Sequence, residues 1–346
     1  MVGTDVGSAS NRSNGAGQLG MMQTGLIGIG AGAAAALLFA SVTSGSWLSV
    51  ILFYLAPLPI MIAGLGWTHW ASLTAAIVAA GAIGLIFGGA FFLAFLAGAG
   101  IPAWWLTYLS LLARPLTATA GASDQPSLEW YPPGRLVLWA AALAALVVLF
   151  AIPNFGLDAE SFRTGLASAL NRMLQLDAGR DGVPAADAER AKRFIDFFVT
   201  VIPPAAAVLA TVTSLVNLWL AGRIVRFSGR LTRPWPEIAA MVFPPTAAIA
   251  LGVATVLSFV DGLVGIVAGV VAASLCMAHA VLGLAVVHDV TRSLNSRPFI
   301  IGGVYASLAV LGWPVLIFAV LGLVETLFGL RARIASKRGP PASTIT

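Results

Sequence analysis

The chain has 346 residues and a formal net charge of +5, and 59% of its residues are hydrophobic whereas only 10% are charged. A soluble domain carries about 25% charged residues, so this composition excludes an ordinary water-exposed surface and predicts a protein that lies mostly in a lipid bilayer. The single cysteine, Cys276, also excludes a disulfide within the chain and a metal site built from cysteines.

Apolar segments follow one another along the chain. Residues 13–113 contain no Asp, Glu, Lys or Arg, and this length must cross a membrane several times because one helical span needs about 20 residues. The apolar segments are 24–42, 47–67, 69–87, 90–113, 136–152, 197–220, 238–260, 263–287 and 299–330. They predict an all-α, polytopic transmembrane helix bundle of about eight to nine spans. Alternatively, the last segment is split at "LGWP", residues 311–314, into a tight pair of short helices.

The sequence predicts one helical domain with a tail at each end. Residues 1–23 are rich in Gly, Ser and Asn, which is a composition typical of disorder. Residues 24–334 are expected to form a single transmembrane domain, and residues 335–346 a flexible C-terminal tail.

Several spans contain residues that break helices. Pro57 and Pro59 lie near the middle of the second span, and "GAGIP" at 98–102 interrupts the fourth. Proline has no N–H group and clashes with the preceding turn, so a neighbouring helix or a cavity must cover the carbonyl groups that it frees. We therefore expect a site at Pro57, with a purely structural kink as the alternative.

A charged insertion at residues 153–196 separates the fifth and sixth spans. Asp158 can cap a helix there, and the apolar residues that follow recur at helical spacing. These residues are Phe162, Leu166, Leu170, Met173 and Leu174. The pattern predicts an amphipathic extramembrane helix that lies on the membrane surface or on the protein itself.

Basic residues predict the orientation. Four arginines between residues 223 and 233 follow the sixth span, and cytoplasmic loops carry an excess of such residues. Counting backward places the N-terminus in the cytoplasm and the insertion at 153–196 outside, so we expect a multi-pass protein of the bacterial inner membrane. No basic stripe interleaves with exposed aromatic residues, so the sequence does not predict a nucleic-acid partner.

Polar residues inside the spans suggest where a ligand binds. Thr211, Ser214 and Asn217 share one face of the sixth span, and an Asn in lipid needs a neighbouring helix or a ligand. His279 lies in the eighth span, where a hydrogen bond to a neighbouring helix is the alternative to a function. The predicted ligand-binding set is Tyr54, Pro57, Pro59, Thr211, Ser214, Asn217 and His279.

Two further groups of residues predict contacts between elements. Gly32, Ala36 and Ala40 form a small-residue ridge, which is typical of a face that docks another helix of this chain or of a partner. Glu325 is expected to pair with Arg331 or Arg333 at the end of the last apolar segment.

The patterns in this sequence that look like catalytic motifs do not indicate an enzyme. "GIGAGAA" at 28–34 matches a dinucleotide-binding pattern, but it lies inside a predicted span with no strand before it. His279 and His288 are nine residues apart, so one straight helix places them on opposite faces. The sequence therefore predicts no enzyme, no cofactor and no metal site.

Four stretches resemble the YybS-like family of bacterial membrane proteins: "ILFYLAPLPIMIAGLGW" at 51–67, "SLVNLWLAGRIV" at 214–225, "GLAVVHDVTR" at 283–292 and "LGLVETLFGLRARI" at 321–334. That family is uncharacterised, and it is distantly similar to the substrate-binding components of energy-coupling-factor vitamin transporters. The resemblance implies that a small molecule binds between helices and that an ATP-driven module docks on the small-residue ridge.

These features together predict an integral membrane protein that binds or transports a small hydrophobic or amphiphilic solute. Its expected partners are the lipid bilayer, the solute, and a membrane protein or ATP-driven module. The alternative is a non-catalytic scaffold or assembly partner, recruited through the charged insertion and the basic loops.

Overall fold

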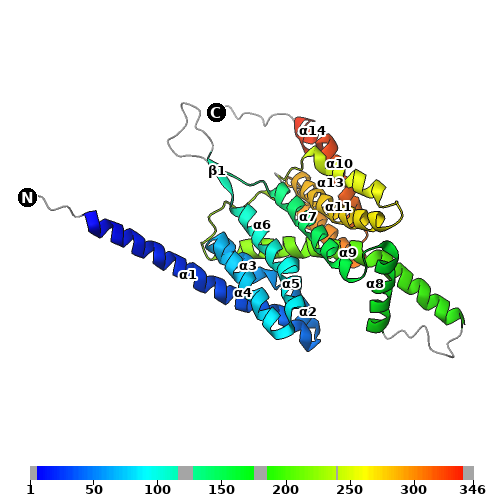
Figure 1. Ribbon diagram of the computed structural model, residues 1–346. Coiled ribbons are helices and arrows are strands. Elements are labelled where there is room, and N and C mark those ends of the chain that lie inside the picture. The colour runs from blue at the N-terminus through cyan, green and yellow to red at the C-terminus, as the bar shows by residue number, and fades with distance from the viewer. Residues whose placement is uncertain (1–5, 116–127, 175–184, 239–240, 338–346) are drawn as a thin grey trace, which may run out of the picture. The chain divides into compact units, whose positions relative to one another are not determined.

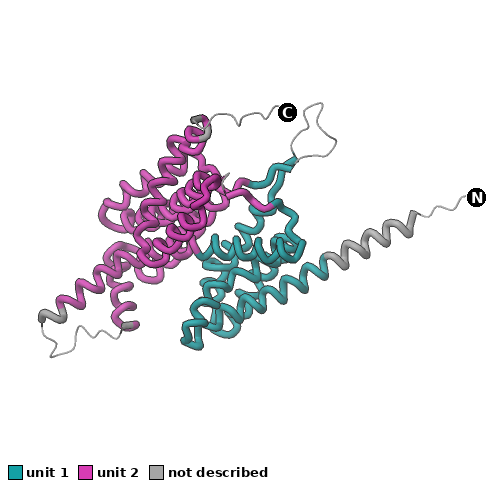
Figure 2. Tube along the Cα trace, turned by 180° about the vertical axis from the view of Figure 1, so that it is seen from behind, with its two compact units in different colours: residues 1–131, 213–234 teal, residues 132–212, 235–346 magenta. Residues whose placement is uncertain are grey.

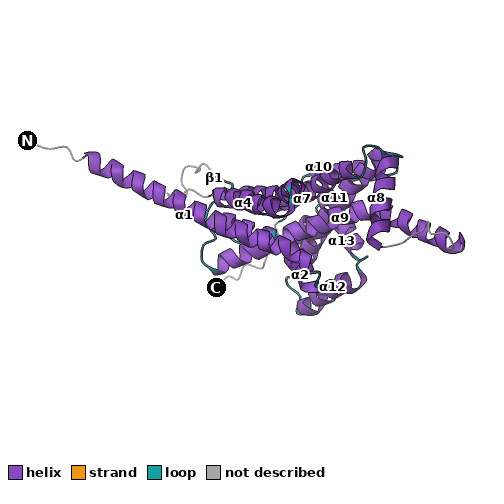
Figure 3. Ribbon diagram, turned by 60° about the horizontal axis from the view of Figure 1, so that its bottom comes forward, coloured by secondary structure: helices purple, strands orange, loops and turns teal. Residues whose placement is uncertain are grey.

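The computed structural model describes residues 6–115, 128–174, 185–238 and 241–337, and these are almost entirely helical (Figures 1 and 3). Its contacts divide the chain into two compact units, where the sequence predicts one domain over residues 24–334 (Figure 2). Unit 1 comprises residues 1–131 and 213–234, and unit 2 comprises residues 132–212 and 235–346. The all-α fold class is confirmed.

Unit 1 contains the first half of the bundle. Its elements are α1 (Val6–Ala40), a short 3-10 helix (Ser41–Ser44), α2 (Trp47–Tyr54), α3 (Pro57–Gly66), α4 (His69–Phe87), α5 (Gly89–Phe95), α6 (Ile101–Leu111), the two-stranded hairpin β1 (Ala113–Pro115) and β2 (Leu128–Trp130), and the last part of α9 (Ala185–Phe227). α1 begins at Val6, within the segment that the sequence assigns to a disordered tail. The predicted third span coincides with α4, which Thr68 caps by accepting a hydrogen bond from the Ala71 N–H group.

The two predicted breaks in unit 1 are confirmed. The second span is divided at Leu55 and Ala56 into α2 and α3, and Pro57 is the first residue of α3, where its missing N–H group is tolerated. In the fourth span, a π-helical turn over Leu96–Gly100 joins α5 to α6. Such turns are rare and occur mostly as single-turn bulges inside α-helices.

The small-residue ridge of α1 packs inside unit 1. Gly32 is buried, and a Cβ atom added there would lie 2.7 Å from the Ala75 carbonyl oxygen and 2.8 Å from the Val78 Cβ atom of α4. Ala36 is also buried, and Ala40 is half-buried. The helix that contacts Gly32 therefore belongs to this chain, which is one of the two alternatives that the sequence left open, and docking of a partner on the ridge stays a prediction.

Arg233 anchors the end of α6 and the hairpin. Its guanidinium group donates to the carbonyl oxygens of Ser110, at 3.2 Å, and Tyr131, at 2.7 Å. The side chain is buried, and this burial lowers the pKa of Arg233 below its ordinary value.

Unit 2 contains the insertion and the C-terminal helices. Its elements are α7 (Pro133–Ala151), a short 3-10 helix (Ile152–Asn154), α8 (Ala159–Leu174), the first part of α9, α10 (Pro245–Leu257), α11 (Leu263–Val290), α12 (Arg297–Leu311), α13 (Val315–Phe328) and α14 (Leu330–Lys337). The last apolar segment forms a pair of helices divided at Gly312, which has a φ of 69°. This is the alternative that "LGWP" offered, and each helix of the pair is too short to span a bilayer straight.

Seven helical segments of the described chain are long and apolar enough to cross a membrane. They are Met21–Ser44, Trp47–Gly66, His69–Phe87, Gly89–Leu111, Pro133–Asn154, Glu189–Phe227 and Leu263–Val290. The predicted seventh span, 238–260, is shorter than expected because its helix, α10, begins only at Pro245 and has 13 residues. α10, α12 and α13 are therefore apolar helices below the length of a full span.

α11 and α13 cross at very close range in unit 2. A Cβ atom on Gly283 would overlap the Phe318 carbonyl oxygen, and one on Gly322 would overlap the His279 carbonyl oxygen. Just beyond this crossing, Glu325 accepts a hydrogen bond of 2.8 Å from the Arg331 side chain, and both side chains are about nine-tenths buried. The predicted pairing of Glu325 with Arg331 is confirmed.

Candidate functional site

The amphipathic helix α8 begins at a strong cap. One carboxylate oxygen of Asp158 accepts hydrogen bonds from the N–H groups of Glu160, at 3.0 Å, and Ser161, at 2.9 Å. The Ser161 hydroxyl donates to the other oxygen at 2.7 Å. These bonds, led by those from Ser161, favour the ionised carboxylate and hold the pKa of Asp158 below its ordinary value.

The apolar face of α8 rests on the protein. Phe162 and Leu166 are buried in a cluster with Ile152, which belongs to the 3-10 helix after α7, and with Ile195 and Val199 of α9. Leu170 packs against the same cluster, whereas Met173, at the end of the same apolar stripe, is 80% exposed. The side chain of Leu174 lies outside the described residues.

α9 carries two consecutive prolines, Pro203 and Pro204, inside the helix. Neither can donate to the carbonyl group four residues earlier. The carbonyl groups of Val199 and Thr200 therefore lose their ordinary intrahelical donors. The Thr200 hydroxyl does not replace them, because it donates to the Asp196 carbonyl oxygen at 3.0 Å.

The turn between α10 and α11 faces this proline pair. Gly262 has a φ of 88°, a left-handed conformation that glycine adopts readily, and it places Asp261 at the tip of the turn. Gly265 and Gly269 follow on the same face of α11. Gly265 packs closely against the backbone of the turn at Val260, whereas a Cβ atom on Gly269 would have Ser258 at 3.9 Å as its nearest neighbour, so Gly269 leaves space beside the prolines of α9.

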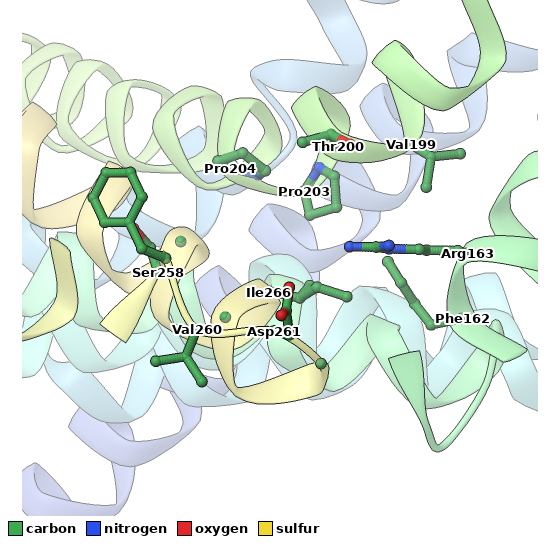
Figure 4. A pocket seen from close by; sticks show the side chains of 14 residues that line it. Phe162, Arg163, Val199, Thr200, Pro203, Pro204, Ser258, Val260, Asp261 and Ile266 are labelled. Carbon is green, nitrogen blue, oxygen red and sulfur yellow. The ribbon is translucent and has the colours of Figure 1, made fainter. Parts of the chain in front are cut away.

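A pocket of about 270 Å³ lies between these three elements (Figure 4). Its walls are the start of α8, the proline segment of α9, and the α10–α11 turn with the first residues of α11. Pockets for drug-sized molecules measure about 300–1,000 Å³, so this one suits a polar headgroup or a similarly small part of a ligand.

Two opposite charges face this pocket. Arg163 follows the buried Phe162 on α8, and Figure 4 shows its side chain reaching toward Pro203 and Asp261. Within the described part of the chain, neither Arg163 nor Asp261 has an ion-pair partner. The pocket therefore combines one donor group of positive charge with one acceptor group of negative charge, between apolar walls.

The predicted residues of the second and sixth spans meet in unit 1. The side-chain amide of Asn217 donates to the Tyr54 carbonyl oxygen at 2.9 Å and to the Thr213 carbonyl oxygen at 2.8 Å. Tyr54 needs this donor because Pro57 has no N–H group and the Leu58 N–H group bonds to Leu55. Asn217 thus covers the carbonyl that the break frees, which is the structural alternative that the sequence left open.

The other predicted site residues are engaged with their own helices or line the break. The Thr211 hydroxyl donates to the Ala207 carbonyl oxygen at 2.8 Å in unit 2, while Ser214 lies on the unit 1 part of α9 and is half-buried. Pro57 and Pro59 are half-buried in the first turn of α3. The structure brings Tyr54 and Asn217 together, and the assignment of the whole set to a ligand stays a prediction.

His279 is fully buried in unit 2. Its Nδ1 atom lies 2.8 Å from the Leu275 carbonyl oxygen of the same helix, and the Phe243 ring packs edge-on at 5.3 Å. Its Nε2 atom has no hydrogen-bond partner among the described residues. The expected bond to a neighbouring helix is therefore replaced by one within α11.

Within the described residues, no group of three or more His, Cys, Asp or Glu side chains lies close enough together to hold a metal ion. The pocket residues that the sequence analysis did not select are Arg163, Thr200, Ser258 and Asp261. Two features of the sequence point to this pocket: the double proline of α9 and an arginine beside the apolar stripe of α8.

A family model described as "Predicted membrane protein (DUF2232)" matches residues 33–326. The chain belongs to this family. The DUF2232 match extends from α1 to α13, so it includes every wall of the pocket as well as the Asn217–Tyr54 contact. The family description names a membrane protein and no reaction or ligand. No curated protein and no solved structure matches the chain.

Proposed function

We propose that this DUF2232 protein binds a small amphiphilic solute and that the polar part of the solute occupies the pocket of unit 2. The observation that supports this most directly is a pair of opposite charges, Arg163 and Asp261, that face a pocket beside a span with two internal prolines and make no ion pair with a described residue. Both side chains are exposed, so the charged groups of a ligand at the mouth of the pocket can reach them.

The position of the pocket along the helices supports an amphiphilic rather than a purely polar solute. α8 is an extramembrane helix by composition, whereas α9 and α11 continue from the pocket as apolar spans. Phe259 and Val260 line the pocket and are 85% and 49% exposed. A solute whose polar group enters the pocket can therefore leave its apolar part against these side chains and the lipid.

The proposal includes a location on the outer side of the inner membrane, because α8 forms one wall of the pocket and belongs to the insertion that the sequence predicts to lie outside. Transport of the solute is an extension of the same proposal, since the two prolines inside α9 give one wall of the pocket a place to bend. A scaffold role receives less support, because the apolar face of α8 is already occupied by the protein itself.

A pocket-filling variant tests the proposal. In Gly269→Leu, the new side chain would occupy the pocket, because a Cβ atom there has Ser258 at 3.9 Å as its nearest neighbour. The matched control is Gly252→Leu on α10, where a Cβ atom meets nothing within 4 Å. The purified full chain is screened with a panel of amphiphiles by thermal unfolding, since a ligand at 100 times its Kd stabilises by about 2.7 kcal/mol.

We expect stabilising amphiphiles to lose their effect on Gly269→Leu and to keep it on Gly252→Leu. Arg163→Gln, which changes an exposed side chain and leaves the helix contacts in place, is expected to weaken the same ligands. If ligands bind both Gly269→Leu and Arg163→Gln as they bind the unaltered chain, the pocket is not the site. Loss of binding in Asn217→Ala alone would instead support the site predicted at the α2–α3 break.

A further inference from the structure

We infer that the ligand of the unit 2 pocket is a zwitterionic aminophospholipid, whose phosphate binds Arg163 and whose protonated amine binds Asp261 and the carbonyl groups freed by the prolines. This inference rests on the proposed function and names the chemical class of the solute.

The anionic part of the ligand follows from Arg163. A guanidinium group offers several N–H donors in a planar fork that matches a phosphate, and here it makes no ion pair with a described residue. α8 holds it in place, because the neighbouring Phe162 side chain is buried against Ile195 and Val199.

The cationic part of the ligand follows from the wall of the pocket that faces Arg163. Asp261 supplies a carboxylate, and the segment before Pro203 and Pro204 supplies carbonyl groups that lack intrahelical donors. A primary ammonium group has three N–H donors, so it can satisfy a carboxylate and two carbonyl oxygens at once. A ligand with an anion alone would leave these acceptors unsatisfied.

The apolar part of the ligand follows from the volume of the pocket and from the side chains at its rim. The pocket of about 270 Å³ admits a headgroup, while the exposed Phe259 and Val260 at its rim offer contacts to the rest of the molecule. Because the spans α9 and α11 continue from the pocket, a lipid in the adjacent leaflet reaches it without leaving the bilayer.

The experiment measures binding of three short-chain lipids with identical acyl chains to the delipidated full chain in detergent. They carry phosphoethanolamine, phosphocholine or phosphoglycerol headgroups, and soluble glycerophosphoethanolamine is the fourth probe. We expect the phosphoethanolamine lipid to bind about tenfold more tightly than the other two lipids, since choline has no N–H donor and glycerol has no positive charge. The soluble headgroup is expected to bind more weakly than the lipid that carries it.

Two variants assign the headgroup contacts. Arg163→Gln should weaken all three lipids about tenfold, whereas Asp261→Asn should weaken the phosphoethanolamine lipid most, bring it to the level of the phosphoglycerol lipid, and leave the phosphoglycerol lipid unchanged. Both side chains are exposed, so neither change threatens the fold.

Other outcomes separate the inference from the proposed function. Equal binding of the three lipids with loss in Gly269→Leu overturns the zwitterion but supports the pocket as an amphiphile site. The same holds if Asp261→Asn has no effect on any lipid. Binding of the soluble headgroup as tightly as the lipid overturns the lipid source. Binding of every probe to Gly269→Leu at unchanged affinity overturns the inference and the pocket together.

Discussion

The two proline-containing helical segments of this protein differ in what lies next to the carbonyl groups that the prolines leave without a donor. In unit 1, the carbonyl group that Pro57 leaves free at Tyr54 accepts a hydrogen bond from Asn217 of α9. In unit 2, the residues before Pro203 and Pro204 border a pocket whose two charged residues make no ion pair within the described part of the chain. The same backbone defect is thus covered by a side chain in one unit and left beside an open space in the other.

The difference teaches how to distinguish a structural break from a site. A freed carbonyl in a buried place needs a donor, and the cost of leaving it without one is about 1–3 kcal/mol. When the protein supplies the donor, as Asn217 does, the break stabilises the bundle. When a residue without a side chain, such as Gly269, keeps the opposite wall open, a ligand or water can supply the donor instead.

The largest expected effect comes from removing the side chain that covers the break between α2 and α3. Asn217→Ala removes the donor to the Tyr54 carbonyl group and leaves a small cavity, so we expect a loss of about 2 kcal/mol in the free energy of unfolding. Denaturation in mixed detergent micelles measures this loss. Val216→Ala, at an exposed position on the same helix, is the control and should change stability by less than about 0.5 kcal/mol. Equal effects of the two changes would contradict the assignment.

The second largest effect is expected when the two prolines inside α9 are replaced. The double variant Pro203→Ala, Pro204→Ala restores two N–H donors to α9, so the carbonyl groups of Val199 and Thr200 regain partners within the helix. We expect ligand affinity to fall about tenfold while stability does not decrease. Titration calorimetry and thermal unfolding check the two parts, and a stable variant with unchanged affinity would show that the freed carbonyls do not contact the ligand.

A smaller effect concerns the wall that α8 contributes. The pKa of Asp158 is lowered in the folded state, so its capping contribution is present at neutral pH and is lost as the pH falls through that lowered pKa, below about 4. Hydrogen exchange at the start of α8, corrected for intrinsic rates, should accelerate in that range. Asp158→Asn keeps a capping side chain that does not titrate, so this variant should show no such step.

The smallest effect is expected at Gly269. The change Gly269→Ala adds a methyl group where Ser258 is 3.9 Å away, and alanine favours the helix by up to about 1 kcal/mol. We therefore expect a slight gain in stability and nearly unchanged ligand affinity, in contrast to Gly269→Leu. A large loss of affinity with alanine would mean that the ligand contacts the α11 backbone directly.

Much of the fold could be predicted from hydropathy and local signals. The bounds of α4 follow from an apolar run between Thr68 and Gly88, and the α8 cap follows from Asp158. Both depend on residues close in sequence. The expected span at 238–260 is longer than α10, because Pro245 begins that helix, whereas Pro203 lies inside one. The pairs Pro203–Pro204 and Pro244–Pro245 are alike in sequence and differ in structure, and only the packing around each pair decides between the two structures.

The candidate site was harder to predict because its residues come from three distant segments. Arg163 follows a residue of an amphipathic stripe, and Asp261 belongs to a turn, so each alone is an ordinary surface residue. Their common pocket depends on how α8 packs on α9 and α11, which local patterns do not contain. The sequence predicts that Asn217, a polar residue inside a span, needs a partner. It does not show which group that partner is, because every residue of a neighbouring helix has a backbone carbonyl like that of Tyr54.

The crossing of Gly283 and Gly322 also determines how the pocket can move. Backbone contact between α11 and α13 leaves no layer of side chains that could slide or change rotamer, and bent or displaced glycines would collide with carbonyl oxygens. The close backbone contact therefore restrains α11, which carries one wall of the pocket at its other end. Under the proposed function, we expect the pocket to open at the opposite wall, where α9 contains two prolines and α8 packs on it.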